Sequence, residues 1–205
     1  MTDRMEEKQS LTIPTLALRG LTIFPNMLLH FDVGRVSSIK ALDEAMSSGQ
    51  PIFLVAQRDL SIENPQREDL YDIGTISNVR QILRLPGDNV RVMVEGTARG
   101  RLLELVQTSP FLSAEVEEIG TDAPVHSSPR TEALMRRTYE LFESYIELAP
   151  KMTPDVLLSV LASEDPGYIA DYIAQNLPMR TGDKQVILEE LRPVRRLERL
   201  YQILR

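Results

Sequence analysis

The chain has 205 residues, a formal net charge of -7, two histidines and no cysteine. The lack of cysteine excludes disulfides and thiolate metal sites, and two histidines are too few for a histidine-rich metal centre. The acidic balance disfavours general nucleic-acid binding, because that binding needs cations to replace the counterions of the phosphate backbone.

The first ten residues, MTDRMEEKQS, are polar and acidic and lack the basic region of a signal peptide. We therefore expect a cytoplasmic protein with a flexible tail at residues 1–11. The apolar passage from Leu16 to Arg35 is too short for a membrane helix and is interrupted by Pro25. No membrane association is expected.

Residues 12–120 show mainly the periodicity of β-strands. Apolar and polar side chains alternate from Met27 to Val33, and two further apolar runs cover residues 51–57 and 111–119. Two long runs rich in Val and Ile flank the turn residues 86–89, which predicts a hairpin.

One helix is predicted within this part, over residues 36–49. Its spacing places Ile39, Leu42 and Met46 on one face, and Gly49 ends it. Several short strands with a single helix indicate a small, partly closed β-barrel.

The pattern changes after residue 120. Residues 120–129 concentrate Gly, Pro, Ser and Thr, which predicts a linker at residues 121–128. Residues 129–205 predict an all-α helical bundle, so the expected fold class is α+β. Helix starts are expected at Ser128-Pro129, Thr153-Pro154, Asp165-Pro166 and Gly182-Asp183, and Pro193 is expected to end or kink the fourth helix. The last apolar stripe still runs at Arg205, which predicts a bundle truncated in its C-terminal helix.

No catalytic constellation is evident. The patterns G-x-x-x-x-G-K-[ST], G-x-G-x-x-G and G-x-S-x-G are absent, and His30 beside Asp32 is interpreted as a polar strand face. We therefore predict that this chain is no enzyme and holds no metal or cofactor. Two arginine sets are interpreted as solvated faces: Arg91, Arg99 and Arg101 on the hairpin, and Arg192, Arg195, Arg196 and Arg199 on the last helix.

Several segments together resemble the N-terminal domain of bacterial Lon, the ATP-dependent protease. They are LRGLTIFPNMLLHFDVGR, a helix ending in ALDEAM, IFLVAQRD, DLYDIGTISNVRQILRLPGDNVRVMVEGTARGRL, DPGYIADYIAQNLP and DKQVILEEL. The resemblance runs in the family's order from Thr12 to the end. One departure is Val36-Ser37-Ser38, where many relatives carry charged residues.

The resemblance implies a PUA-like barrel at residues 12–120, in which Leu16–Leu18 and Met27–Val33 are paired strands, followed by the bundle. It implies a hexameric parent, a serine endopeptidase with an AAA+ module that uses ATP and Mg²⁺. Neither module lies in these residues. The fragment itself is expected to take part in protein quality control, with unfolded or degron-bearing proteins and other Lon subunits as partners.

A binder of unfolded segments needs exposed apolar patches and adaptable side chains. The candidate contact residues for protein are Pro25, Met27, Arg35, Lys40, Leu85 and Pro86. Two other functions remain as alternatives: a stand-alone PUA-like module that binds RNA or a small ligand, and a hydrolase of unrecognised type. The apolar stripe that runs to Arg205 favours the Lon fragment over a stand-alone module.

Overall fold

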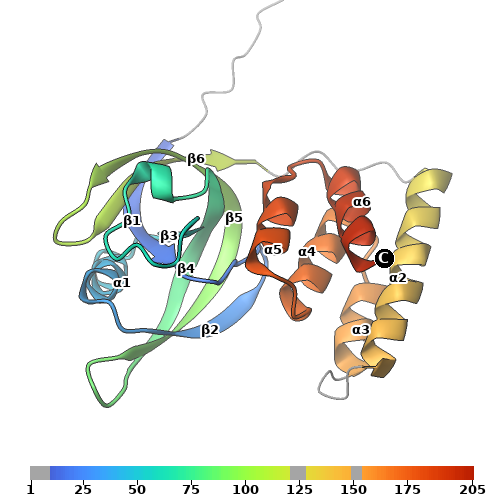
Figure 1. Cartoon of the computed structure of the whole chain (residues 1–205), viewed down its shortest axis with the longest axis horizontal. Coiled ribbons are helices and arrows are strands. Elements are labelled where there is room, and N and C mark those ends of the chain that lie inside the picture. Colours follow the sequence, from blue (N-terminus) through green and yellow to red (C-terminus); the bar gives the residue numbers. More distant parts are fainter. Residues whose placement is uncertain (1–9, 121–127, 149–153) are drawn as a thin grey trace, which may run out of the picture. The chain divides into compact units, whose positions relative to one another are not determined.

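The computed structural model describes residues 10–120, 128–148 and 154–205 (Figure 1). Its internal contacts divide the chain into two units, Met1–Gly120 and Thr121–Arg205. We call the described part of the first the strand unit and that of the second the helical unit. The α+β class is confirmed. None of the helices in the described residues is both long and apolar enough to span a bilayer.

The strand unit contains six strands, one α-helix and one 3-10 turn. The strands are β1 (Ser10–Leu18), β2 (Leu28–Val33), β3 (Ile52–Ala56), β4 (Ile73–Arg84), β5 (Val90–Gln107) and β6 (Leu112–Ile119). They form one mixed sheet in the order β2-β5-β4-β3-β1-β6, and β5 also pairs with β6. Within the described strands, β1 and β3 run parallel and the other ladders are antiparallel.

The local predictions for these strands are confirmed. β2 alternates between outward and inward residues, and all five residues of β3 are buried. β4 and β5 form the predicted hairpin around a turn in which Gly87 and Asp88 have positive φ. Because φ above zero suits Gly and Asp best, this turn explains the choice of residues.

The predicted pairing of Leu16–Leu18 with Met27–Val33 is wrong. β1 pairs with β3 and β6, whereas β2 pairs with β5 at the far end of the strand order. The connection crosses the unit through Ile23 and Phe24, which are buried. The chain turns at Gly20 and Asn26, both of which have positive φ.

Helix α1 (Val36–Ser48) ends at Gly49 in a left-handed conformation, as predicted. Its buried residues are Ser38, Ala41, Leu42 and Ala45, with a spacing of three and four. Met46 is 47% exposed, so its predicted place on the buried face is wrong. Small residues allow the helix to lie close to the strands, and Met46 falls just outside that stripe.

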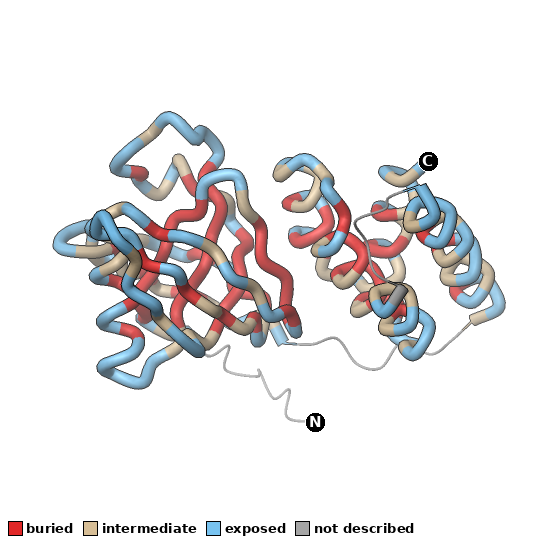
Figure 2. Tube along the Cα trace, turned by 90° about the horizontal axis from the view of Figure 1, so that it is seen from below, coloured by how far each residue is buried: buried red, intermediate tan, exposed pale blue. Residues whose placement is uncertain are grey.

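Two apolar clusters form the core of the strand unit. Its buried residues are drawn in red in Figure 2. One joins Leu42 and Ala45 of α1 to Val90, Val92 and Val94 of β5. The other contains Phe53, Leu102 and Val116. A Cβ on Gly100 would lie 2.6 Å from Val116 Cγ1, so the absence of a side chain there lets β5 approach β6 closely.

The helical unit contains α2 (Pro129–Leu148), α3 (Pro154–Leu161), α4 (Pro166–Asn176), α5 (Thr181–Glu189) and α6 (Pro193–Leu204). Ser128 Oγ accepts a hydrogen bond from the Thr131 backbone N–H (3.1 Å), and Asp165 accepts one from Gly167 (2.8 Å). Both side chains cap their helices as predicted. Pro193 is the first residue of α6. Proline suits this position because the first turn of a helix needs no backbone N–H donor.

Strand β1 begins at Ser10, inside the predicted tail, because Ser10 and Leu11 pair with Glu117 and Val116 of β6. Residues 1–9 and the predicted linker residues 121–127 lie outside the described residues.

The arginines of α6 are not all solvated. Arg196 is buried and donates to Asp171 Oδ2 (3.1 Å) and to the carbonyl oxygens of Glu190 (2.8 Å) and Leu191 (3.0 Å). Glu190, also buried, accepts hydrogen bonds from Arg192 (3.0 Å) and Arg199 (3.2 Å). This network joins α4, α6 and the segment before α6.

Candidate protein-binding surface

The six predicted contact residues all lie in the strand unit, but at separate places. Pro25 and Met27 are buried beside β5, where the Asn26 N–H donates to the Gly96 carbonyl (2.9 Å). Pro25 and Met27 lie just before the start of β2, whereas the β4–β5 turn lies beyond the other end of β2. At the usual rise per strand residue, the two places are about 20 Å apart. A protein contact needs exposed side chains, so these two residues provide no apolar surface.

The tip of the β4–β5 hairpin does present apolar side chains. Pro86 is exposed, Leu85 is half-buried, and Leu83, which the sequence analysis missed, is 46% exposed. Leu83 and Leu85 share one face of the hairpin because strand residues alternate. The Leu85 N–H donates to the Asn89 carbonyl (2.8 Å) and closes the turn. We call Leu83, Leu85 and Pro86 the tip patch.

Helix α1 is tied to this hairpin. Arg84 Nη2 donates to both carboxylate oxygens of Asp43, at 2.9 and 3.0 Å. Ahead of the helix, a Cβ on Gly34 would lie 2.4 Å from Asn89 Oδ1, so the chain passes close to the turn. The outward side of α1 carries Val36 (66% exposed), Lys40 and Met46, which we call the helix patch. Together the two patches form the hairpin–helix surface.

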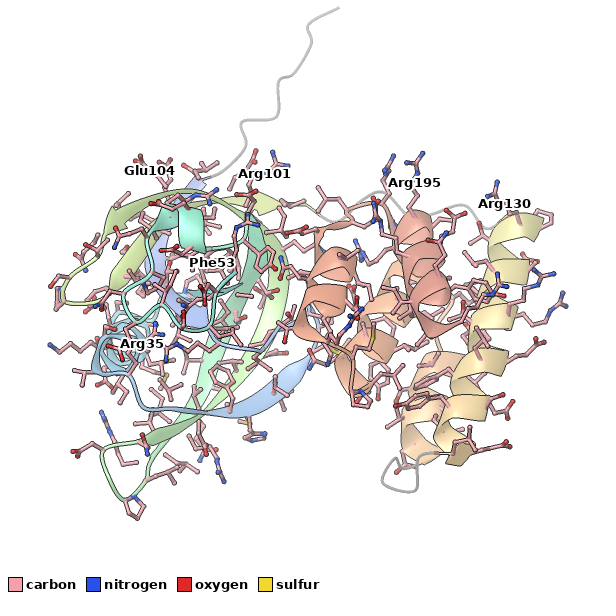
Figure 3. The ribbon with its side chains drawn as sticks, in the orientation of Figure 1. Arg35, Phe53, Arg101, Glu104, Arg130 and Arg195 are labelled. Atoms are coloured by element: carbon pink, nitrogen blue, oxygen red, sulfur yellow. The ribbon has the colours of Figure 1, made fainter. Side chains whose placement is uncertain are left out.

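Arg35 has a different environment from Lys40. It is half-buried, and its Nη2 donates to Gln57 Oε1 (2.9 Å); Figure 3 labels it beside α1. Burial lowers the pKa of Arg35, the charge of Arg19 lowers it further, and Glu63 partly offsets both. Arg35 lines a groove, whereas Lys40 lies on the exposed side of the helix.

The alternating arginines of β5 do not form a free basic stripe. Arg91 is held by Asp32 in two hydrogen bonds (2.7 and 2.9 Å), and Arg101 lies 3.7 Å from Glu117. Arg99 is buried, so its interpretation as part of a solvated face is wrong. A phosphate backbone would have to compete with these carboxylates, which disfavours the RNA-binding alternative.

The helical unit has an apolar surface that the sequence analysis did not single out. Leu148 is 85% exposed on α2, and Leu158 and Leu161 are exposed on α3, which packs against α2. Tyr145 of α2 is also partly exposed. Leu141, Tyr145 and Leu148 continue one helical stripe, a spacing that was available from the sequence.

Solved structures share this fold. The N-terminal domain of Mycobacterium avium complex Lon protease covers 95% of this chain, with 98% of its own chain covered, a TM-score of 0.72 and 17% identity. The Lon N-terminal domain protein from Xanthomonas campestris gives a TM-score of 0.67 at 16% identity, with 94% and 98% covered. The fold is therefore that of Lon N-terminal domains.

Sequence comparison identifies the family. The family model of the ATP-dependent protease La (LON) substrate-binding domain matches residues 12–205. The chain belongs to this family. Among curated relatives, the Lon protease of Heliobacterium modesticaldum is 43% identical over 202 residues, and that of Clostridioides difficile 42% over 195. These matches cover 97% and 94% of this chain but 25% of each relative, so the chain spans about a quarter of their length.

Proposed function

We propose that this chain is the substrate-binding part of a Lon-type ATP-dependent protease and that it holds unfolded protein segments on the hairpin–helix surface. The observation that carries the proposal is the exposure of Val36, Met46, Leu83 and Pro86 where α1 and the hairpin meet. Exposed apolar side chains of this kind fit segments that folded proteins hide.

The proposal extends to the longer protein. In it, ATP, Mg²⁺ and the protease chemistry belong to parts outside this chain, and this part has no catalytic role and no cofactor of its own. The parent would be a cytoplasmic hexamer that removes misfolded and regulatory proteins. The β5–β6 pairing supports a partly closed, PUA-like barrel as the scaffold.

A binding titration of the whole chain tests the proposal. The probes are a chemically unfolded protein, the same protein folded, and a short RNA. We expect the unfolded protein to bind more tightly than the folded one, with no RNA binding at physiological salt. Equal binding of the folded and unfolded forms, or binding of RNA alone, would overturn the proposal.

Variants locate the surface. The double substitution Leu83→Asp and Pro86→Asp should weaken binding of the unfolded protein by about tenfold or more, because it removes apolar contact area. Leu158→Asp, at an exposed leucine of α3, is the control and should leave the affinity unchanged. If the control weakens binding and the hairpin variant does not, binding belongs to the helical unit.

A further inference from the structure

A groove of about 610 Å³ opens in the strand unit, between the end of β1 and the segment that joins β2 to α1. One part of its lining is apolar: Leu16, Leu18, Leu21, Phe31 and Val33. The other part is polar: Arg19, Asp32, Arg35, Ser38, Glu63 and Asn64. The volume is within the usual range for sites that bind small ligands.

The two arginines retain most of their hydrogen-bonding capacity. Among the described residues, Arg19 donates one hydrogen bond, to the Ile62 carbonyl (2.9 Å), and Arg35 donates one, to Gln57 Oε1 (2.9 Å). A guanidinium has five N–H donors in a planar fork that matches a carboxylate. No carboxylate of the described residues lies within 4 Å of either guanidinium. The groove therefore offers N–H donors that no described residue accepts from.

The position of Arg35 is fixed by a buried amide. Gln57 is 2% exposed and accepts from Arg35 while its Nε2 donates to the carbonyl oxygens of Asp59 (3.2 Å) and Ile62 (2.9 Å). Arg19 donates to that same Ile62 carbonyl. One loop thus orients both arginines, so a ligand meets a prepared pair and not two free side chains.

The charges around the groove select for a single negative charge. Asp32 is neutralised by its two hydrogen bonds with Arg91, at 2.7 and 2.9 Å. Arg19 and Arg35 against Glu63 then leave a local excess of one positive charge. A run of acidic residues would be repelled by Glu63, whereas one carboxylate beside an apolar group is complementary.

We propose that this groove binds the C-terminal end of a polypeptide, with the terminal carboxylate on Arg19 and Arg35 and an apolar last side chain against the half-buried Leu21 and Phe31. In a chain end, the carboxylate and the last side chain are attached to one Cα. This spacing fits a groove in which the two arginines lie close to an apolar wall. The inference rests on the proposed function, which makes protein the partner. It adds a site that reads a chain end, separate from the hairpin–helix surface that takes internal apolar segments.

Three fluorescently labelled ten-residue peptides test the inference by polarisation with the whole chain. The first ends in Leu with a free carboxylate, the second is the same peptide with a C-terminal amide, and the third is the amide with one internal Asp. We expect the free acid to bind at least about tenfold more tightly than either amide, because the amides lose a charge-assisted pair of hydrogen bonds. Equal binding of all three, or no binding of any, overturns the inference, and equal binding of the third and the first overturns the assignment to a chain end.

Two substitutions localise the effect. Arg35→Gln and Arg19→Gln should each weaken binding of the free-acid peptide and reduce its advantage over the amide. Arg195→Gln, which removes an exposed arginine of α6 outside the groove, should leave that advantage unchanged. Arg19 is exposed, so its variant keeps the test valid if loss of the Gln57 contact unfolds the Arg35 variant. An unchanged ratio of affinities in a folded Arg19→Gln variant contradicts the inference.

The two proposals fail separately. If the unfolded protein binds while free-acid and amidated peptides bind alike, the groove inference is wrong and the proposed function stands. If the peptides differ as expected but the unfolded protein does not bind, the hairpin–helix surface is wrong and the groove remains.

Discussion

Arg196 and Glu190 show how a single side chain can depart from the pattern of its helix. The sequence of α6 has an arginine-rich side, and a solvated face is the ordinary interpretation of such a pattern. Arg196 is nevertheless buried because Asp171 on α4 and two backbone carbonyl groups accept its hydrogen bonds. A partner more than twenty residues away has no signature within the helix, so this burial could not be predicted from α6 alone.

Glu190 makes stability depend on pH. Burial alone would raise its pKa, but hydrogen bonds from Arg192 and Arg199 outweigh burial and lower the pKa from 4.5 to about 2. The unfolded chain therefore binds a proton at higher pH than the folded chain, and stability is lost as pH falls from about 4.5 to about 2. Above that window the contribution is complete.

The measurement is the free energy of unfolding between pH 6 and pH 3, for the wild type and Glu190→Gln. The wild type should lose more stability over this range than the variant, which has no carboxyl to protonate. Glu147→Gln, an exposed position on α2, is the control and should follow the wild type. Parallel curves for wild type and Glu190→Gln would contradict the assignment.

Gly100 illustrates a residue chosen for space. Gly100→Ala should destabilise the chain by about 1–3 kcal/mol, because its Cβ would lie 2.6 Å from Val116 Cγ1 and 2.9 Å from Phe53 Cε2. Gly182→Ala is the matched control, since nothing lies within 4 Å of a Cβ there. Because Gly182 lies in α5, the control should be neutral or stabilising by up to about 1 kcal/mol. Urea unfolding of both variants decides the point.

At the scale of elements, α1 gives the clearest test of which face is buried. Leu42→Ala should cost about 2–5 kcal/mol, since Leu42 is fully buried in the core under the helix. Met46→Ala should cost less than about 0.5 kcal/mol, because that side chain is largely exposed. Thermal unfolding measures the stability of both variants. Comparable losses of stability would mean that Met46 lies on the buried face, as the spacing predicted.

The elements that could be predicted are those determined by nearby residues. The alternation in β2, the turn at Gly87 and Asp88, Gly49 after α1 and the caps Ser128 and Asp165 all act within a few residues of the feature they produce. Strand pairing does not: the parallel ladder of β1 with β3 depends on residues more than thirty positions apart. No local signal therefore corrects the pairing of β1 with β2 that the resemblance implies.

The candidate surface follows the same division. Leu85 and Pro86 could be predicted because a hairpin turn exposes its own residues. Pro25 and Met27 also lie at a turn, but β5 covers them, and only the tertiary structure shows that. The connection of α1 to the hairpin through Asp43 and Arg84 is likewise non-local.

For the whole molecule, each unit has its own buried residues and can be tested by itself. A polypeptide of residues 1–120 contains both apolar clusters of the strand unit and all six strands. We expect it to fold and to unfold cooperatively with the circular dichroism of a β-rich protein. A non-cooperative transition would contradict the division into two units.

Strand β1 also determines when the strand unit can be completed during synthesis. Its first half pairs with β6, and the hydrogen bond from Ser113 Oγ to the Ile13 carbonyl joins residues 100 positions apart. A ribosome that adds about 5–20 residues per second needs several seconds to cover that distance. Throughout this interval the apolar residues of β1 have no strand partner on that side. The nascent protein is then itself a chain with an uncovered apolar segment, the kind of molecule that its finished form is proposed to bind.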